Sequence, residues 1–268
     1  MAIDVQHYID TYDQFKFEVV EDRVLEIVFS NPGKLNAVSA RGHAQLAVIW
    51  PDISADENIR AVIVRGEGRA FCAGGEMDII DEMAVSASAR LRGMRETRDI
   101  VYNIINCSKP IVSAMHGVAV GAGLCVGLLA DVSIATPDVR LVDGHTRFGV
   151  PAGDGAVLIW PLLMGMAKAK YHVLTCEPIL GKDAERMGVV SLCVEADELV
   201  PTARKVARRL VSGSQSAIEM TKYAMNSWLR LAGPSYDISM AYEFLGLAGD
   251  DVQEGVKALR EKREPNFS

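Results

Sequence analysis

Residues 69–76 read Arg-Ala-Phe-Cys-Ala-Gly-Gly-Glu, and residues 116–123 read His-Gly-Val-Ala-Val-Gly-Ala-Gly. Each stretch follows a mostly apolar run, at 61–64 and at 110–114, that is typical of a buried strand. The second stretch leads into a helix-like apolar segment at 124–131. A strand that ends at small residues and continues as a helix leaves backbone N–H groups unpaired at the positive end of that helix. Two such turns predict a site for a developing negative oxygen, such as an enolate.

The spacing of these motifs resembles the enoyl-CoA hydratase/isomerase (crotonase) superfamily. The resemblance rests on Ala-Phe-x-Ala-Gly-Gly and Gly-x-Ala-x-Gly-Ala-Gly, some forty residues apart, and extends along nearly the whole chain. Shorter matches occur at residues 31–32, 36–37, 109–110 and 254–267. The resemblance implies that the backbone N–H groups of Gly75 and Ala122 bind the carbonyl oxygen of a thioester.

The resemblance also implies the fold, an α/β spiral of repeated ββα units over residues 1–199 with a C-terminal helical region over residues 200–268. In the superfamily, this helical region covers the site and helps to form trimers, which often pair into hexamers. The residue pattern agrees, because residues 15–29 alternate as a hairpin does and residues 40–52 and 86–106 have helical spacing. Further strands are predicted at 61–65, 111–115, 131–135 and 140–142, and further helices at 123–130, 156–165, 168–175, 182–188 and from 199 onward.

Composition narrows the class of protein. With 268 residues, 49% apolar and 24% charged, the chain is predicted to be an ordinary soluble globule. Its net charge of -7 argues against a nucleic-acid partner, and the basic cluster at 204–209 is read as the solvated face of a helix. No run of about 18 apolar residues predicts a membrane span. The N-terminus does not have the pattern of a secretory signal.

The five cysteines are an odd number without CxxC or Cys/His metal spacing. This pattern is typical of reduced thiols in the cytoplasm, and neither a disulfide framework nor a metal site is predicted.

Many hydratases of the superfamily carry two glutamates, and this chain has Cys125 and His145 at the matching positions. The ordinary syn-hydration mechanism is therefore not expected, because adding water to an enoyl thioester needs groups that activate the water and protonate the α-carbon. Asp154 is the predicted replacement, since dienoyl-CoA isomerases and 4-chlorobenzoyl-CoA dehalogenases of the superfamily use an aspartate at this point. The alternative is that Asp154 only caps the helix that follows it. Cys125 is interpreted as a buried small side chain in preference to a nucleophile.

His145 precedes Asp154 by nine residues and is predicted to transfer protons, with a hydrogen-bonded structural role as the alternative. His43 is a weaker candidate for a residue that faces the substrate. Together with Glu243, these residues fall at positions similar to the polar residues of 6-oxocamphor hydrolase, a superfamily member that cleaves β-diketones. A further histidine of that enzyme is replaced here by Ala122. For Glu243, a structural role and a catalytic role remain open.

The resemblance implies coenzyme A as part of the substrate and no separate cofactor. It places the adenine near the backbone of Cys72, Ala73 and Gly74, and the phosphates near basic side chains. Candidate residues at similar locations are Lys222, Lys262 and Phe267, with solvated lysines as the alternative.

The sequence therefore predicts an enzyme that stabilises the enolate of an acyl-CoA thioester, with Asp154 and His145 as the proton-handling pair. Hydration or double-bond isomerisation of an enoyl-CoA is the expected reaction. Carbon–carbon hydrolysis of a cyclic β-diketone, which needs no CoA, is a second hypothesis. A scaffold that has kept the fold and lost catalysis is the third.

Overall fold

The computed structural model describes residues 2–267. It contains a six-stranded sheet in the order β1-β2-β3-β4-β6-β9 and a three-stranded sheet in the order β5-β7-β8. The strands are β1 (Phe15–Val20), β2 (Val24–Phe29), β3 (Ala61–Gly66), β4 (Ile111–Met115), β5 (Val118–Val120), β6 (Val132–Ala135), β7 (Arg140–Val142), β8 (Ile179–Leu180) and β9 (Leu192–Cys193). Only the β1–β2 and β7–β8 pairs are antiparallel. The predicted hairpin and central strands are confirmed.

Helices connect the strands and cover both faces of the larger sheet. They are α1 (Val5–Thr11), α2 (Ala40–Ala55), α3 (Met77–Val85), α4 (Ala87–Asn106), α5 (Gly121–Leu129), α6 (Ala156–Met164), α7 (Met166–Thr175), α8 (Gly181–Met187), α9 (Leu199–Ser212), α10 (Gln215–Met225), α11 (Ser227–Leu231), α12 (Gly233–Gly246) and α13 (Asp251–Glu261), with short 3-10 turns at Pro32–Lys34 and His145–Phe148. Within residues 2–267, no helix is both long and apolar enough to cross a membrane.

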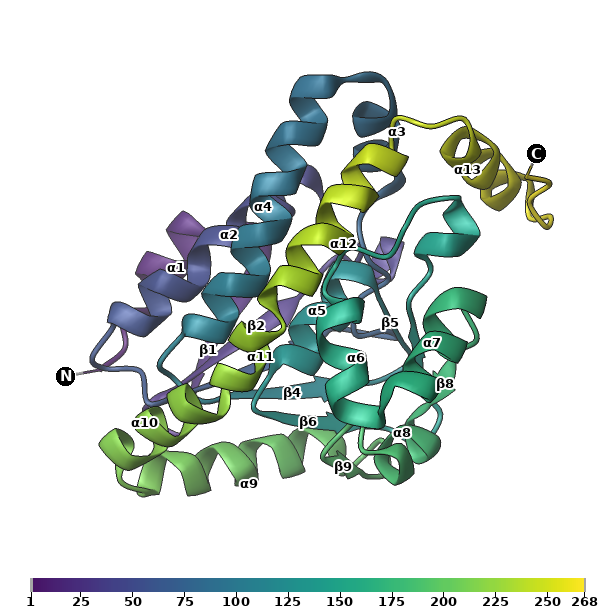
Figure 1. Cartoon of the computed structure of the whole chain (residues 1–268). Coiled ribbons are helices and arrows are strands. Elements are labelled where there is room, and N and C mark those ends of the chain that lie inside the picture. The colour runs from purple at the N-terminus through teal and green to yellow at the C-terminus, as the bar shows by residue number, and fades with distance from the viewer. Residues whose placement is uncertain (1, 268) are drawn as a thin grey trace.

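The two faces of the larger sheet bury different cores. Side chains such as Leu25 and Ile27 of β2 join the main core with α2 and α4, whereas Val24 faces the other way, toward α9. Small α9 residues, Ala203 and Ala207, let this helix pack closely against the sheet. Figure 1 shows α9 running beneath β4 and β6, and α12 lying between α4 and α6. The spiral is therefore enclosed by helices from the C-terminal end of the chain.

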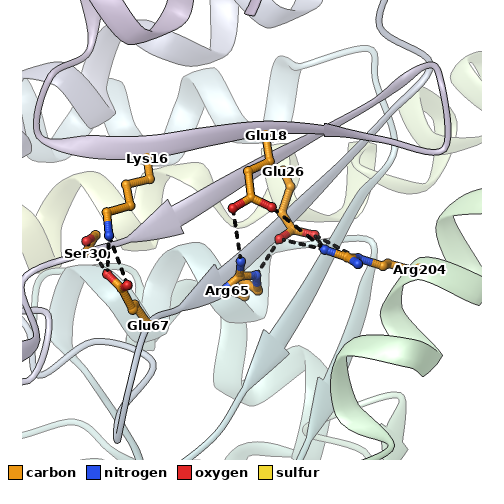
Figure 2. Close-up of polar contacts among 7 residues, drawn as sticks. All are labelled: Lys16, Glu18, Glu26, Ser30, Arg65, Glu67 and Arg204. Carbon is orange, nitrogen blue, oxygen red and sulfur yellow. Dashed lines mark hydrogen bonds and ion pairs between the residues drawn. The ribbon is translucent and has the colours of Figure 1, made fainter.

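A buried carboxylate ties α9 to the sheet. Glu26 of β2 points to the α9 side and is fully buried, where it contacts Arg65 of β3 and Arg204 of α9 (Figure 2). Its Oε2 lies 3.3 Å from the Arg204 guanidinium. Glu18 approaches both arginines from the exposed rim at 3.8 and 3.9 Å. Removal of the buried member would leave two partly buried cations with only the exposed Glu18 nearby.

We expect Glu26→Ala to lower the free energy of unfolding by about 3–5 kcal/mol, because breaking a buried ion pair leaves its partner uncompensated. Glu18→Ala is the matched control, and it should cost less than about 1 kcal/mol because the Glu18 side chain is 53% exposed. Urea denaturation followed by circular dichroism measures both. Equal small losses for the two variants would show that Glu26 does not hold α9 on the sheet.

The division of the chain at residue 200 stays a prediction. The helices beyond it are present, but Tyr236, Met240 and Phe244 of α12 belong to the same buried core as the strands. This packing brings α12 over the spiral, where it contributes to the site described next.

Candidate active site

A cavity of about 630 Å³ lies among α3, α4, α12 and the two glycine-rich turns. It is lined by four of the predicted catalytic side chains, by both predicted oxyanion residues and by apolar groups of α3 and α12. The polar and small lining residues include His43, Glu96, Gly74, Gly75, Gly121, Ala122, His145, Asp154 and Glu243. Residues that are distant along the chain therefore share one cavity.

Strand-like pairing on both sides holds the first turn. Cys72 N donates to Val118 O at 3.1 Å, which docks the turn on β5. On the other side, Val38 N donates to Gly74 O at 2.8 Å and Glu76 N donates to Val38 O at 2.9 Å. In this parallel bridge the neighbours of Gly75 bond with Val38, so the N–H group of Gly75 itself points the opposite way. It is thereby left free beside the cavity.

The second turn places another unpaired amide nearby. Gly121 has φ +51°, a left-handed conformation that favours glycine, and it begins α5. Ala122 is the second residue of α5, so its N–H has no intrahelical acceptor. A Cβ atom added at Gly121 would lie 3.7 Å from the Gly74 Cα and 3.1 Å from Asp154 Oδ2. The two turns and the Asp154 carboxylate therefore converge.

His145 is at the centre of a buried polar cluster. Its Nδ1 lies 3.0 Å from Asp143 Oδ1, and its Nε2 lies 3.5 Å from Asp154 Oδ2 and 3.6 Å from Glu243 Oε1. Burial by itself would lower the pKa of His145, but the Asp143 and Asp154 carboxylates outweigh it and hold the pKa well above its usual range. The carboxylate of Asp143 accepts a hydrogen bond from the Nδ1–H group, and Nε2 points toward the carboxylates of Asp154 and Glu243.

Asp154 lies before the start of α6 without capping it. The N-cap position belongs to Gly155, which has φ +99°, and no side chain in residues 2–267 caps this helix. The Asp154 carboxylate instead contacts His145 Nε2. The capping alternative thus lacks the hydrogen bond that would define it, and the catalytic role stays a prediction.

Glu243 of α12 enters the cluster from the C-terminal helices. A Cβ atom at Gly153 would lie 2.1 Å from Glu243 Oε2, so only glycine there leaves room for the carboxylate. Burial, reinforced by the charge on Asp154, raises the pKa of Glu243 to about 7, while His145 opposes this shift. Its second oxygen has no hydrogen-bond partner among the described residues. Glu243 can therefore exchange a proton near neutral pH.

The predicted CoA-binding residues separate into two groups. Ala73 and Gly74 line the cavity, whereas Cys72 is buried behind it and Lys262 and Phe267 lie exposed outside it. The structure argues against Lys222, whose ammonium is buried and engaged by Lys109 O at 2.7 Å and Asp131 Oδ2 at 2.8 Å. These contacts join α10 to the sheet and leave no free cation for a phosphate.

A metal ion could be held by His145, Asp154 and Glu243, whose ligand-type atoms all lie within 4.8 Å of one another. The same three groups form ion pairs without one. The Asp143 and Asp154 carboxylates hold the pKa of His145 well above its usual range, which favours a protonated ring that pairs with them. The sequence predicts no metal here.

Comparison with known proteins identifies the family. The family model described as Enoyl-CoA hydratase/isomerase matches residues 20–268. The chain belongs to the enoyl-CoA hydratase/isomerase family. It is therefore an enzyme of this family, with the reaction left open.

Relatives match this hydratase/isomerase-family chain over nearly its full length. It is 28% identical over 258 residues to the 1,2-epoxyphenylacetyl-CoA isomerase of Escherichia coli, covering 95% of this chain and 98% of that protein. It is 26% identical to the short-chain-enoyl-CoA hydratase of Clostridium acetobutylicum, covering 91% and 94%. An enoyl-CoA hydratase/isomerase structure from Mycobacterium paratuberculosis has 30% identity and a TM-score of 0.87, covering 91% and 97%. The predicted crotonase-like fold is confirmed.

Within this enoyl-CoA hydratase/isomerase family member, Cys125 is no nucleophile. It is buried in α5, and burial together with the Asp154 and Asp143 charges raises the pKa of its thiol well above the ordinary value. The thiol therefore stays protonated and unreactive. The interpretation of Cys125 as a buried small side chain agrees with this environment.

Sequence reasoning missed two carboxylates that pair with the predicted histidines of this family member. Asp143 is only two positions from His145 and accepts from its backbone N–H as well as its ring, so an Asp-x-His pattern was the available signal. Glu96 of α4 lies 2.8 Å from His43 Nδ1 of α2, but 53 positions separate the two residues. No local sequence pattern predicts the His43–Glu96 pair.

We expect the stability of this family member to fall as pH rises from about 4.5 to about 7. The folded state retains a proton on Glu243 that the unfolded chain releases above its ordinary pKa of 4.5, so unfolding becomes easier as pH increases. His145 acts in the same direction at higher pH, because its raised pKa also favours the protonated folded state. Glu243→Gln should remove a pH-dependent loss on the order of 1–3 kcal/mol.

Urea denaturation of wild type and Glu243→Gln at several values from pH 4.5 to 8 measures this difference. Parallel stability curves for the two proteins would contradict the assignment of a raised pKa to Glu243.

Proposed function

We propose that this chain acts on an acyl-CoA thioester and that the N–H groups of Gly75 and Ala122 bind the carbonyl oxygen as it becomes an enolate. The observation that carries the proposal is the convergence of two unpaired amides and a buried His–carboxylate cluster on one cavity. Such preorganised donors are usually the largest single contribution to stabilising a developing oxyanion. The names of the relatives, which refer to enoyl-CoA and acyl-CoA thioesters, support the same substrate class.

The proposed reaction is hydration or double-bond isomerisation of an enoyl-CoA. A carbonyl polarised in the oxyanion hole makes the α-carbon of the substrate easier to protonate or deprotonate. Asp154 lies beside the second turn, where its carboxylate can move that proton. His145 and Glu243 lie within 3.6 Å of one another and can pass the proton on or hold a water. Both reactions use the same residues, and the position of the double bond and the access of water decide between them.

We expect crotonyl-CoA hydration to be slow compared with glutamate-bearing members of the family. Cys125 and His145 replace the two glutamates that hold the attacking water, and well-placed acid–base groups are typically worth about 100- to 10,000-fold in rate. Steady-state assays of crotonyl-CoA beside longer, branched and aromatic enoyl-CoA thioesters test this. Rapid crotonyl-CoA hydration by the wild type would refute this account of the missing glutamates.

Hydrolysis of a cyclic β-diketone is a second candidate, favoured by one specific observation. The Asp143–His145 hydrogen bond orients an imidazole toward the Asp154 and Glu243 carboxylates, and a carboxylate in this cluster can take a proton from a water that attacks a carbonyl. This reaction needs no CoA. Stabilisation of the purified protein against heat by acyl-CoA, but not by a bicyclic diketone, favours the thioester proposal. Turnover of the diketone alone would replace that proposal, and turnover of neither class supports the catalytically degenerate scaffold.

We also infer that the chain assembles as a homotrimer or a pair of trimers in the cytoplasm. Exposed apolar side chains gather on helices α10–α12, among them Met225, Trp228 and Leu231, each at least 67% exposed. Apolar patches of this kind mark interfaces. The five cysteines carry no disulfide among the described residues, which fits a reducing compartment. Light scattering of the purified protein gives the mass that tests the assembly.

A further inference from the structure

A second histidine–carboxylate pair lies in the cavity apart from the proton-handling cluster. His43 of α2 and Glu96 of α4 face each other with His43 Nδ1 2.8 Å from Glu96 Oε2, and their side chains are only 13% and 19% exposed. Both residues line the cavity that contains the oxyanion turns. Among residues 2–267, no hydrogen bond or ion pair joins them to His145, Asp154 or Glu243. The proposed reaction therefore leaves this pair unused.

The chemistry of the pair defines what its free atom can bind. A carboxylate oxygen accepts hydrogen bonds, so Glu96 Oε2 accepts a hydrogen bond from the Nδ1–H group of His43. In the neutral ring, Nε2 is then an acceptor with its lone pair available. No protein group in the described part of the chain bonds to Nε2, and this atom is not sealed inside the protein. His43 lines the cavity, so a ligand bound there can supply a donor to this atom.

A structural role explains the pair poorly. Helices α2 and α4 are already joined by packed apolar side chains and by Asn103 Nδ2, which donates to Ala47 O at 2.7 Å. Burial of an ionisable pair has a desolvation cost that tight packing of apolar side chains does not have. The cavity wall includes apolar side chains such as Met83 of α3 and Phe244 of α12, together with the charged Glu82 and Arg92. A few polar groups in an apolar pocket generally fix the orientation and identity of a ligand.

We propose that the His43–Glu96 pair binds a hydroxyl group carried by the acyl part of the substrate, away from the carbons that react. The substrate class is then a hydroxylated acyl-CoA thioester, whose hydroxyl donates to His43 Nε2 while its thioester oxygen occupies the oxyanion hole. This inference rests on the proposed acyl-CoA function. It adds a selection for oxygenated acyl groups, because an acyl chain without a hydroxyl would displace water from His43 Nε2 and supply no hydrogen bond in its place.

Calorimetric binding of saturated thioesters tests the inference, since these do not turn over as enoyl-CoA does. The probes are 4-hydroxybutanoyl-CoA, 6-hydroxyhexanoyl-CoA and 4-hydroxyphenylacetyl-CoA, each beside the same thioester without its hydroxyl. The wild type should bind at least one hydroxylated member about three- to tenfold more tightly than its counterpart. In His43→Phe that ratio should fall to about one. His7→Phe, which changes a histidine that is half exposed outside the cavity, should keep the wild-type ratio.

The variant His43→Leu gives a second readout should His43→Phe fold poorly. Leucine has no hydrogen-bonding atom in its side chain, so the preference for the hydroxyl should be lost there too. Equal binding of every pair by the wild type, or a preference that survives in both variants, would overturn the inference and leave the acyl-CoA proposal intact. Failure of all six thioesters to bind the folded wild type would overturn the acyl-CoA proposal, and the inference with it.

Discussion

Asp154→Asn is expected to lower kcat on the preferred thioester by about 100- to 10,000-fold. Asparagine keeps nearly the same shape but cannot accept or release a proton, so the loss reports proton transfer. The substitution also removes one of the charges that hold the pKa of His145 high. The change should therefore appear in kcat and in its pH profile more than in KM, because the oxyanion hole and the apolar wall still bind the substrate.

Asp138→Asn is the matched control, since Asp138 is exposed and lies outside the cavity. It should leave the kinetics of the wild type unchanged. Circular dichroism and urea denaturation of both variants establish that each is folded. A folded Asp154→Asn enzyme with the wild-type kcat would remove Asp154 from the mechanism and transfer the acid–base role to His145 and Glu243.

Ala122→Pro is expected to lower kcat by about 100- to 1,000-fold, the usual loss when one oxyanion donor is removed. Proline has no backbone N–H, and it is tolerated in the first turn of a helix, where Ala122 lies. The preceding residue is Gly121, whose lack of a Cβ relieves part of the clash that a proline imposes on its predecessor. The substitution thus removes the donor with a small demand on the fold.

Ala122→Gly keeps the N–H group and serves as the control, with kcat expected to stay within about tenfold of the wild type. Steady-state kinetics of the two variants on the same thioester give the comparison. Similar rates for folded Ala122→Pro and Ala122→Gly would show that this amide does not bind the reacting oxygen.

Much of the fold could be predicted because the signals are local. Mostly apolar runs at residues 61–64 and 111–115 form the parallel strands β3 and β4, which are buried on both faces. Ser39 and Ser86 accept hydrogen bonds from the first turns of α2 and α4, as N-cap residues do. The elements that escaped prediction are α1, α3, β5 and the two-residue strands β8 and β9. Short elements are stabilised by tertiary contacts, such as the buried Tyr8 of α1, more than by their own residues.

Some residues of the candidate site could be predicted from the sequence and others could not. Gly75, Ala122, His145 and Asp154 lie in glycine-rich segments with a recognisable order, and the structure places all four on one cavity. The predicted roles of these residues await the experiments above. The prediction that Lys222 binds a CoA phosphate could not be checked from the sequence, because a lysine near the end of a helix has the same local pattern whether it is solvated or buried against Asp131.

The sequence by itself determined which segments become strands, helices and amide-bearing turns, because those choices depend on residues a few positions apart. Only the tertiary structure decided the electrostatics of the site. Glu243 is brought to His145 by the packing of α12 over the spiral, and Glu96 is brought to His43 by the packing of α4 on α2. Burial and charge at these meeting points raise the pKa of Glu243 and place the His43–Glu96 pair in the wall of the cavity. Both depend on three-dimensional proximity, which the order of residues along the chain does not display.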